Sequence, residues 1–437
     1  MKPINVGLLG IGTVGCGTFT VLARNAEEIA RRAGRPILIS VVADKNTERA
    51  KEITRGACKV TDDAFSVVND PAVDIVVELI GGCGVAKELV LKAIANGKHV
   101  VTANKALLAM HGNEIFAAAQ KMRVMVAFEA AVAGGIPIIK AVREGLAANH
   151  IEWIAGIING TTNFILSEMR DRGTDFDTVL KEAQRLSYAE ADPTFDIEGI
   201  DAAHKITILS AIAFGTPMQF DKVYVEGITK LHSLDIKYAE RLGYRIKLLG
   251  ITRRTPDGIE LRVHPTLIPA KRLIANVEGA MNAVLVQADA VGATLYYGKG
   301  AGSEPTASSV IADLVDVTRL HTADPESRVP HLAFQPNQLM SLPVLPIEEI
   351  HSSYYLRLRV QDEPGVLADI TRVLADEKIS IDAVIQKEPG ESEDECDLVL
   401  LTHLTVEKLI NDAIARIEKL SVVVGKVVRL RMEVLGK

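Results

Sequence analysis

Acidic side chains and one lysine crowd a short segment of the chain, residues 188–205. Its charged residues are Glu190, Asp192, Asp196, Glu198, Asp201 and Lys205. Asp201 and Lys205 are four residues apart, so a helix that begins near residue 198 places both on one face. Ile208 and Ile212 continue that face, and a charged pair on an apolar face must be paired internally or open into a cleft. A lysine held beside carboxylates in a partly dry cleft is a candidate acid or base.

A glycine pattern near the start of the chain predicts a dinucleotide site. Gly10, Gly12 and Gly15 form Gly-x-Gly-x-x-Gly between an expected strand and an expected helix. Gly10 allows a tight turn, Gly12 lets a pyrophosphate approach the backbone, and Gly15 permits close helix–strand packing. The helix start adds N–H groups and the positive end of the helix dipole. The alternative is a tight turn with a purely structural role.

The residues after the second expected strand do not distinguish NAD from NADP. Asp44 follows the strand at residues 37–43, where a carboxylate would bind a ribose 2′-hydroxyl and favour NAD. Lys45 beside it would instead meet the 2′-phosphate of NADP. Asp44 is also common in ordinary turns, so the pattern alone leaves these alternatives open.

Lys105 stands just beyond another expected strand, at the end of the sequence Val-Val-Thr-Ala-Asn-Lys of residues 100–105. Ligands of open parallel sheets lie beyond the carboxyl ends of the strands, so we expect Lys105 to reach cofactor and substrate. An isolated lysine in this place would more often be a surface residue. Residues 78–82, Glu-Leu-Ile-Gly-Gly, end a similar strand, and their glycines would admit a nicotinamide ring or form a plain turn.

Two polar or glycine-rich loops precede expected helices. Residues 159–163, Asn-Gly-Thr-Thr-Asn, would cap a helix through Thr161 or Thr162, or present short polar side chains to a ligand. Residues 297–306, Tyr-Gly-Lys-Gly-Ala-Gly-Ser-Glu-Pro-Thr, would face the cofactor or form a structural loop.

The elements that must position these residues follow from local patterns. Strand and helix patterns alternate over residues 1–130 and predict a parallel sheet with helices on both faces. The expected strands are 4–9, 37–43, 74–80, 99–102 and 124–128, and the expected helices are 14–33, 86–96 and 113–121. Residues 131–325 mix strands and helices and predict an α+β domain. Its last helix, near residues 305–320, could pack back on the first domain.

The end of the chain predicts a third domain. Five prolines between residues 325 and 350, without helical or strand periodicity, predict a linker over residues 326–350. Residues 351–437 follow the order strand, helix, strand, strand, helix, strand, which is typical of a ferredoxin-like module. The predicted fold class is therefore α/β, with a Rossmann-type doubly wound parallel sheet, an α+β domain and a C-terminal ferredoxin-like domain.

Composition argues against several function classes. The chain has 437 residues, 48% of them hydrophobic, and a mean hydropathy of +0.18, as expected for two or three packed domains. A net charge of −7 without a basic stripe, and 4% aromatic residues, argue against nucleic acid and anionic membranes as partners. No apolar run reaches the length of a membrane span, and the first strand leaves no room for a signal peptide. The four cysteines include no Cys-x-x-Cys pair, so we expect reduced thiols in a cytoplasmic protein.

Together these motifs resemble the homoserine dehydrogenase family. The resemblance covers about residues 1–325 and runs through 10–15, 100–105, 129–137, 156–166, 188–205 and 298–306. It implies interconversion of L-homoserine and L-aspartate 4-semialdehyde with NAD(P)H, in threonine, methionine and isoleucine biosynthesis. Lys205 would then donate the proton to the carbonyl oxygen. Lys105 would assist in proton transfer and in stabilising the negative charge, and Asp201 would orient the substrate or Lys205. Glu190 would hold the substrate ammonium, and Asp196 would line the substrate site.

The resemblance also implies ligand contacts and an oligomer. NADP or NAD would be held by Gly10, Gly12, Thr13, Val14, Gly15, Asp44, Lys45, Thr102, Lys105, Gly300 and Gly302. A monovalent cation, sodium, would be bound by the backbone carbonyls of Glu129, Val132, Gly134 and Ile136. Carbonyl ligands leave no side-chain pattern, so no sequence argument could find that site. The family resemblance further implies a homodimer or homotetramer.

Three positions depart from the family pattern. Ser187 stands where the family usually has glycine, at a position whose backbone would face the ligand. Lys299 stands where the family favours proline or another small residue, in the glycine loop near the cofactor. Ala43 stands where the family often carries arginine, which weakens an assignment to NADP.

The C-terminal module resembles an ACT domain, a regulatory fold that binds small molecules. Residues 362–367, Asp-Glu-Pro-Gly-Val-Leu, lie between its first strand and first helix, where Gly365 would allow a tight turn that exposes N–H groups. The implied effector is L-threonine, with contacts from Asp362, Gly365, Val366 and Leu367. The alternative is a dimerisation module that binds no ligand.

Two other functions compete with the family assignment. The first is a related NAD(P)-dependent oxidoreductase that acts on another amino-acid semialdehyde or hydroxy acid. A phosphorylating aldehyde dehydrogenase would need a cysteine nucleophile, and Cys83 has no obvious histidine partner. The second is a non-catalytic sensor of dinucleotide and amino acid, which would have no need for proton donors such as Lys105 and Lys205.

Overall fold

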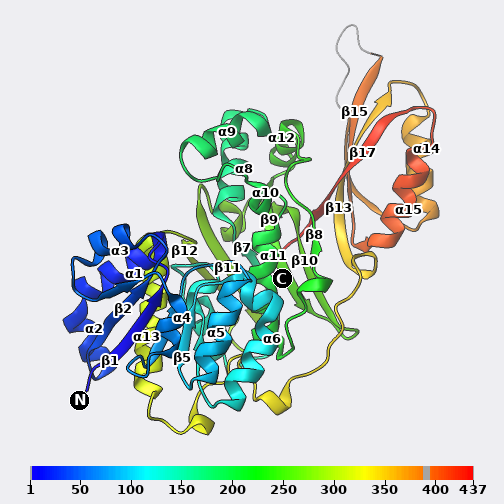
Figure 1. The fold of residues 1–437 in the computed structure, drawn as a ribbon. Helices are drawn as coiled ribbons and strands as arrows, with labels where there is room; N and C mark the ends of the chain where they lie inside the picture. Colours follow the sequence, from blue (N-terminus) through cyan, green and yellow to red (C-terminus); the bar gives the residue numbers. More distant parts are fainter. Residues whose placement is uncertain (1, 387–393, 437) are drawn as a thin grey trace. The chain divides into compact units, whose positions relative to one another are not determined.

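The computed structural model describes residues 2–386 and 394–436, and Figure 1 traces their elements. The chain forms two compact units, which we describe separately. The first comprises Met1–Gly160, Asp201–Val223 and Ala280–Leu342, and the second comprises Thr161–Ile200, Tyr224–Gly279 and Pro343–Lys437.

The first unit contains a six-stranded parallel sheet in the order β3-β2-β1-β4-β5-β6. Its strands are β1 (Ile4–Leu9), β2 (Ile37–Ala43), β3 (Lys59–Thr61), β4 (Ile75–Glu78), β5 (His99–Thr102) and β6 (Val126–Ala127). The helices between them are α1 (Thr13–Arg24), α2 (Ala26–Ala33), α3 (Thr47–Thr54), α4 (Ala64–Asn69), α5 (Val85–Ala95) and α6 (Lys105–Lys121). The strand order reverses between β1 and β4, and that switch point is where doubly wound sheets bind ligands. The predicted Rossmann-type sheet is confirmed.

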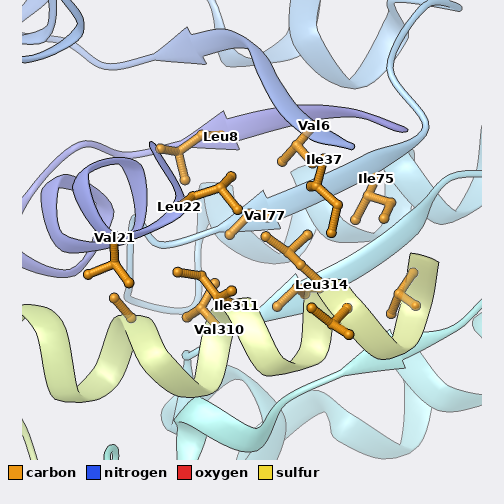
Figure 2. Close-up of a cluster of buried hydrophobic side chains, with 14 of the residues drawn as sticks. Val6, Leu8, Val21, Leu22, Ile37, Ile75, Val77, Val310, Ile311 and Leu314 are labelled. Atoms are coloured by element: carbon orange, nitrogen blue, oxygen red, sulfur yellow. The ribbon is translucent and has the colours of Figure 1, made fainter. Parts of the chain in front are cut away.

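A helix from late in the sequence completes the core of this sheet. In α13 (Ser303–Leu320), Val310 and Leu314 are fully buried, in one cluster with Val6 and Val77 of the sheet. Figure 2 shows these side chains of the helix and the strands pointing toward one another. Each such side chain contributes about 1.5–3 kcal/mol when it is removed from water. The helix expected near residues 305–320 therefore packs on the dinucleotide-binding sheet.

The first unit also holds the elements that carry the candidate catalytic residues. β7 (Ile151–Ile157), β11 (Met281–Ala288) and β12 (Gly292–Lys299) form antiparallel pairs in the order β12-β11-β7. α11 (Ile200–Phe214) is buried along nearly its whole length. The short helices η1 (Glu129–Ala131), α7 (Ile138–Lys140) and η2 (Ala141–Gly145) follow β6.

The second unit begins with helices and continues as a sheet. Its first elements are α8 (Gly160–Arg172), α9 (Phe176–Arg185), α10 (Thr194–Ile197), β8 (Tyr224–Val225), α12 (Ser233–Arg241), β9 (Tyr244–Arg254) and β10 (Ile259–Pro269). β10 pairs with β9 in antiparallel fashion and with β8 in parallel fashion. β8, and the start of the loop that follows it, therefore lie beside β10.

The C-terminal part of the second unit has the predicted ferredoxin-like order. It comprises β13 (His351–Gln361), α14 (Val366–Asp376), β14 (Ile381–Gln386), β15 (Glu395–Thr402), β16 (Thr405–Val406), α15 (Glu407–Ile417) and β17 (Val423–Met432). The main strands follow the order β17-β13-β15-β14, and α14 and α15 cover one face of this sheet (Figure 1).

This module is tied to the rest of the second unit by strand pairing and by buried polar contacts. β17 pairs in parallel with β10, through Thr266 with Arg431 and Leu267 with Met432. On the other face of the module's sheet, the Tyr355 hydroxyl and the Arg357 guanidinium bind the fully buried Asp235 of α12 at 2.9 and 2.6 Å. The module is therefore packed on the β9–β10 part of the unit.

Two helices differ from their sequence patterns. The helix expected over residues 14–33 is interrupted at Asn25, whose φ of −106° and ψ of 19° separate α1 from α2. α6 begins at Lys105 rather than at residue 113, because the Asn104 side chain accepts a hydrogen bond from the Leu107 N–H and caps the helix start. Among the described residues, no helix combines the length and apolar character needed to cross a membrane.

The buried His99 is expected to lower the stability of the fold at acidic pH. Its Nδ1 accepts a hydrogen bond from the Met125 N–H at 2.9 Å, and burial, then the nearby His321 and Arg328, lowers its pKa from 6.5 to about 3. The unfolded chain thus binds a proton that the folded chain does not, so stability falls as pH drops from about 6.5 toward 3. His99→Asn, whose amide oxygen can replace Nδ1, should flatten the dependence of unfolding free energy on pH by about 1.4 kcal/mol per pH unit. Urea unfolding at pH 6 and pH 4 measures this slope; the exposed His150→Asn is the control, and equal slopes in wild type and His99→Asn would contradict the prediction.

Candidate active site

The expected pairing of Asp201 with Lys205 is present on α11. The Lys205 ammonium lies 2.7 Å from Asp201 Oδ2, and the two residues are only 8% and 3% exposed. The four-residue spacing places both on one helix face, as the sequence predicts. Both side chains are buried on a helix whose other residues are mostly apolar, so each needs charged or polar partners within the protein.

Three further groups from distant parts of the sequence complete the cluster. The Lys105 ammonium, at the start of α6, lies 2.9 Å from Asp201 Oδ1. The Asn159 amide donates to Asp201 Oδ2 at 2.8 Å, and Lys205 donates to the Ile158 carbonyl at 2.7 Å, both just after β7. One carboxylate thus binds two ammonium groups and an amide. The Asn159 and Ile158 contacts were not predicted, because they join residues far apart in sequence.

The charge of this cluster suits chemistry at an oxygen atom. Burial alone would raise the pKa of Asp201, yet the charges of Lys205 and Lys105 hold that pKa well below its usual range, so the carboxylate is ionised. Burial lowers the pKa of the neighbouring His204 to about 4, so this histidine is neutral near pH 7. Two ammonium groups against one carboxylate can stabilise negative charge and supply a proton. The Lys105 side chain is 34% exposed against 10% for Lys205, so water reaches it more easily.

The predicted substrate residues Glu190 and Asp196 belong to the second unit, where Thr161 contacts both ends of the segment 188–196 that contains them. The Thr161 hydroxyl lies 2.6 Å from the Tyr188 carbonyl and 3.1 Å from Asp196 Oδ2. α8 begins at Gly160, so neither Thr161 nor Thr162 is its cap, and that expectation is wrong. Glu190 is exposed, and its carbonyl accepts a hydrogen bond from Gln184.

The backbone at Ser187 explains why glycine suits this position. Its φ is +60°, in the left-handed region that glycine adopts at little cost and other residues adopt rarely. A serine here costs about 1 kcal/mol relative to an unstrained backbone. Serine in place of the family's glycine at position 187 therefore strains the backbone and leaves the charge of the site unchanged.

The glycine motif has the geometry of a phosphate-binding turn. Gly10 has φ +91°, and a Cβ there would lie 2.8 Å from the Leu79 carbonyl, while a Cβ on Gly15 would lie 2.1 Å from the Gly10 carbonyl. A Cβ on Gly12 would meet no protein atom within 4 Å, which leaves that side of the loop open. α1 starts at Thr13 with no side chain capping its N–H groups. These features fit a dinucleotide pyrophosphate.

The second glycine loop meets the first at the helix starts. The Ser303 hydroxyl donates to the Thr13 carbonyl at 2.9 Å, and a Cβ on Gly17 would lie 2.5 Å from the Ser303 carbonyl. Gly302, with φ +135°, precedes the first residue of α13. The sequence-predicted cofactor residues near 10–15 and near 300–302 therefore lie together in the first unit.

Asp44 is turned toward the glycine loop. Its Oδ2 accepts a hydrogen bond from the Ile11 N–H and its Oδ1 from the Asn46 N–H, both at 2.8 Å. The carboxylate therefore holds the loop in place, and further lone pairs on both oxygens can accept a ribose hydroxyl. Lys45 is exposed beside it.

Thr102 and Glu78 join two loops at the carboxyl edge of the sheet. The fully buried Glu78 accepts hydrogen bonds from the N–H groups of Ile80 and Gly81 and, at 2.7 Å, from the Thr102 hydroxyl. The Thr102 hydroxyl in turn accepts from the Asn104 N–H at 3.0 Å. These hydrogen bonds hold residues 102–104 in the conformation that precedes Lys105. Thr102 therefore stabilises the loop at the end of β5. The sequence pattern does not predict these hydrogen bonds between Thr102, Glu78 and Asn104.

The carbonyls predicted to bind a cation lie in a buried, sharply turned segment. Ala133 and Gly134 both have positive φ, +52° and +26°. The Ser309 hydroxyl of α13 donates to the Gly134 carbonyl at 2.6 Å, and the Ile136 carbonyl accepts from the Ile138 N–H. Each carbonyl oxygen has a second lone pair, so both can still coordinate an ion, and oxygen ligands suit sodium. Within residues 2–386 and 394–436, no cluster of three acidic, histidine or cysteine side chains could hold a metal ion.

The expected effector turn divides into exposed and core residues. Gly365 has φ +102° and precedes α14, as expected for a tight turn. Leu367 is 40% exposed, whereas Val366 is buried in the core of the module. Asp362 Oδ1 accepts a hydrogen bond from Gln386 at 3.2 Å.

Comparison with known proteins assigns the chain to a family. The family model described as the homoserine dehydrogenase NAD binding domain matches residues 10–129, and the model described as homoserine dehydrogenase matches residues 137–315. An ACT domain model matches residues 354–421. The homoserine dehydrogenase of Pseudomonas aeruginosa is 63% identical over the full length of both chains. The chain belongs to the homoserine dehydrogenase family.

Solved structures of homoserine dehydrogenases share the fold. The enzyme from Thiobacillus denitrificans is 70% identical and superimposes with a TM-score of 0.96, covering 100% of this chain and 99% of that one. A hyperthermophilic archaeal homoserine dehydrogenase in complex with NADPH is 26% identical, with a TM-score of 0.63, and covers 72% of this chain and 98% of that one. The chain is thus an NAD(P)-dependent oxidoreductase with a Rossmann-type domain and a C-terminal ACT domain.

Proposed function

We propose that this homoserine dehydrogenase interconverts L-homoserine and L-aspartate 4-semialdehyde through the cluster formed by Lys105, Asp201 and Lys205. The observation that carries the proposal is the single buried carboxylate that binds two ammonium groups. Reduction of the aldehyde places negative charge on its oxygen, and a nearby ammonium both stabilises that charge and supplies the proton. A sensor without catalysis would have no use for this arrangement.

Each member of the cluster has a separate task. Lys205 donates the proton to the carbonyl oxygen, held in place by the Ile158 carbonyl and by Asp201. Lys105, the more exposed lysine, contributes charge and exchanges protons with water. Asp201 binds and orients both ammonium groups. In the reverse direction the same lysine accepts the proton of the homoserine hydroxyl.

Glu190 and Asp196 are proposed to bind the amino-acid end of the substrate. A carboxylate is the natural partner of the substrate ammonium. Thr161 fixes Asp196 and the Tyr188 carbonyl, which shapes the segment around Glu190. The residues at the two ends of segment 188–205 thus serve binding and proton transfer.

NADP or NAD supplies or accepts the hydride when bound. The residues proposed to hold it are Gly10, Gly12, Thr13, Val14, Gly15, Asp44, Lys45, Thr102, Lys105, Gly300 and Gly302. The open face of Gly12 and the uncapped start of α1 support the phosphate contacts. Sodium is proposed at the carbonyls of Glu129, Val132, Gly134 and Ile136, where it would hold the turn that α13 supports through Ser309.

The division of labour along the chain is also a proposal. Residues 1–130 would bind the dinucleotide, 131–325 would bind substrate and support a homodimer or homotetramer, 326–350 would act as a linker, and 351–437 would regulate. L-threonine is proposed as the effector, with contacts at Asp362, Gly365, Val366 and Leu367. The positive φ of Gly365 supports a turn with exposed N–H groups.

A steady-state assay of L-homoserine oxidation tests the proposed function. Rates with NAD and with NADP are compared, each with and without L-threonine, using the full chain. We expect turnover with at least one cofactor and a lower rate in the presence of threonine. No turnover of L-homoserine would contradict the catalytic proposal, and turnover that threonine leaves unchanged would contradict only its regulatory part.

Glu190→Gln is expected to raise KM for L-homoserine about tenfold or more with a small change in kcat. The substitution removes the charge that binds the substrate ammonium, and a hydrogen bond to a charged group is worth about 1.5–3 kcal/mol. Steady-state kinetics at saturating cofactor measure both constants. The partly buried Glu182→Gln, in the neighbouring helix α9, is the control, and an equal KM in Glu190→Gln and wild type would reject the assignment.

A further inference from the structure

A cavity of about 350 Å³ in the second unit lies between the loop after β8 and the ACT module. Its polar lining includes Glu226 and Lys230 from the loop, and Asn411 and Arg429 from α15 and β17. Apolar walls come from both sides as well, among them Leu231 and Ile414. The volume falls in the range of sites that bind small molecules.

The charged groups of this cavity retain atoms that can bind a ligand. The Tyr224 hydroxyl and the Arg431 guanidinium both contact Oε2 of Glu226, at 2.9 Å each, so Oε1 can accept another hydrogen bond. Arg429 contacts Asn411 and Glu407 through Nη1, which leaves donors on Nε and Nη2.

Lys230 adds a second cation to the cavity, because it lines the cavity and is exposed to solvent. Two cations and one carboxylate beside apolar walls match a small molecule with a carboxylate, an ammonium and a short apolar group.

We propose that this cavity is a binding site for an α-amino acid. The ligand carboxylate binds Arg429 and Lys230, its ammonium binds Oε1 of Glu226, and its side chain lies against Leu231 and Ile414. This site is separate from the turn at Gly365 and goes beyond the threonine contact proposed there.

The loop that lines the cavity also holds the segment that contains Asp196. The Ile228 N–H donates to the Ile197 carbonyl at 2.8 Å, and the Thr229 hydroxyl donates to Glu198 at 3.0 Å. A Cβ on Gly227 would lie 2.4 Å from the Ile197 carbonyl, so the two segments are in direct contact. A ligand that shifts Glu226 therefore displaces the residues next to Asp196 and raises KM for the substrate.

Isothermal titration calorimetry on the full-length enzyme tests the site, with the twenty protein amino acids as probes and L-threonine first. At least one of them is expected to bind wild type. Lys230→Ala should weaken that binding about tenfold or more, because it removes a charged hydrogen bond. The exposed Lys237→Ala, on α12, and Leu367→Ala, at the Gly365 turn, should leave this dissociation constant unchanged. Without ligand, kcat should be the same in wild type, Lys230→Ala and Lys237→Ala.

The outcomes separate the two sites. Binding in Lys230→Ala that equals wild type, or no binding of any amino acid to wild type, would overturn the cavity site. Loss of binding only in Leu367→Ala would overturn it as well and would support the Gly365 turn. In a second readout, the bound amino acid should raise KM for L-homoserine in wild type and in Lys237→Ala but not in Lys230→Ala, and a KM that does not respond in wild type would overturn the coupling to Asp196.

Discussion

Lys205→Met is expected to lower kcat for the reduction of L-aspartate 4-semialdehyde by about 10²–10⁴-fold, the usual contribution of a general acid. Methionine is about as long as the lysine stem and fills the buried space, but it carries no proton. Lys105 stays ion-paired to Asp201 in the variant and can supply part of the charge, so activity should fall without vanishing. Cofactor affinity should be unchanged, because the glycine loop does not involve Lys205.

The measurement combines stopped-flow hydride transfer with fluorescence titration of NADPH. Lys98→Met is a matched control, since Lys98 is also buried and its ammonium is bound by the carbonyls of Asp70 and Val73. That variant should lose stability but keep its rate per folded molecule. A Lys205→Met enzyme with a rate close to wild type would remove the proton-donor assignment.

Asp201→Asn is expected to reduce both activity and stability. Without the carboxylate, two ammonium groups face each other, and breaking a buried pair costs about 3–5 kcal/mol of unfolding free energy. We expect the low end of this range, because Lys105 is one-third exposed. Both lysines should also lose their orientation, so kcat should fall about 10²–10³-fold.

The stability difference between wild type and Asp201→Asn should depend on pH in a defined direction. The pKa of Asp201 is lowered in the folded state from its unfolded value of 3.8, so its contribution is complete above about pH 4 and is lost as pH falls through the folded pKa. Urea unfolding at pH 7 and at pH 3 measures the difference. Asp235→Asn is the control, a buried carboxylate that bridges Tyr355 and Arg357, which should lower stability but not kcat. An Asp201→Asn enzyme with normal kcat would contradict the assigned role.

Local patterns predicted the parts of the site that depend on short-range geometry. The four-residue spacing of Asp201 and Lys205 fixed their pairing, and Gly10, Gly12 and Gly15 marked the turn at β1. The order of strands and helices was enough for the Rossmann-type sheet and the ferredoxin-like module. These features depend on hydrophobic periodicity and backbone conformation, and both are determined mainly by residues close together in the sequence.

Contacts between distant segments could not be predicted in the same way. Lys105 meets Asp201, and Asn159 meets Asp201, only because β5, β7 and α11 are brought together by the fold. Thr161 has the sequence of a helix cap but binds Asp196 instead, and its partner is decided by packing. Short exposed elements such as α3, α4 and β3 bury too few residues to leave a clear pattern.

The central claim is that Lys205 and Asp201 act as one unit with Lys105, and a double-mutant cycle tests it most directly. Single-turnover hydride transfer would be measured for wild type, Lys205→Met, Asp201→Asn and the double variant under saturating cofactor and substrate. Residues that act together are non-additive, so the double variant should be about as slow as the slower single variant. Losses that multiply, with the double variant slower by the product of the two single effects, would show independent roles and contradict the account.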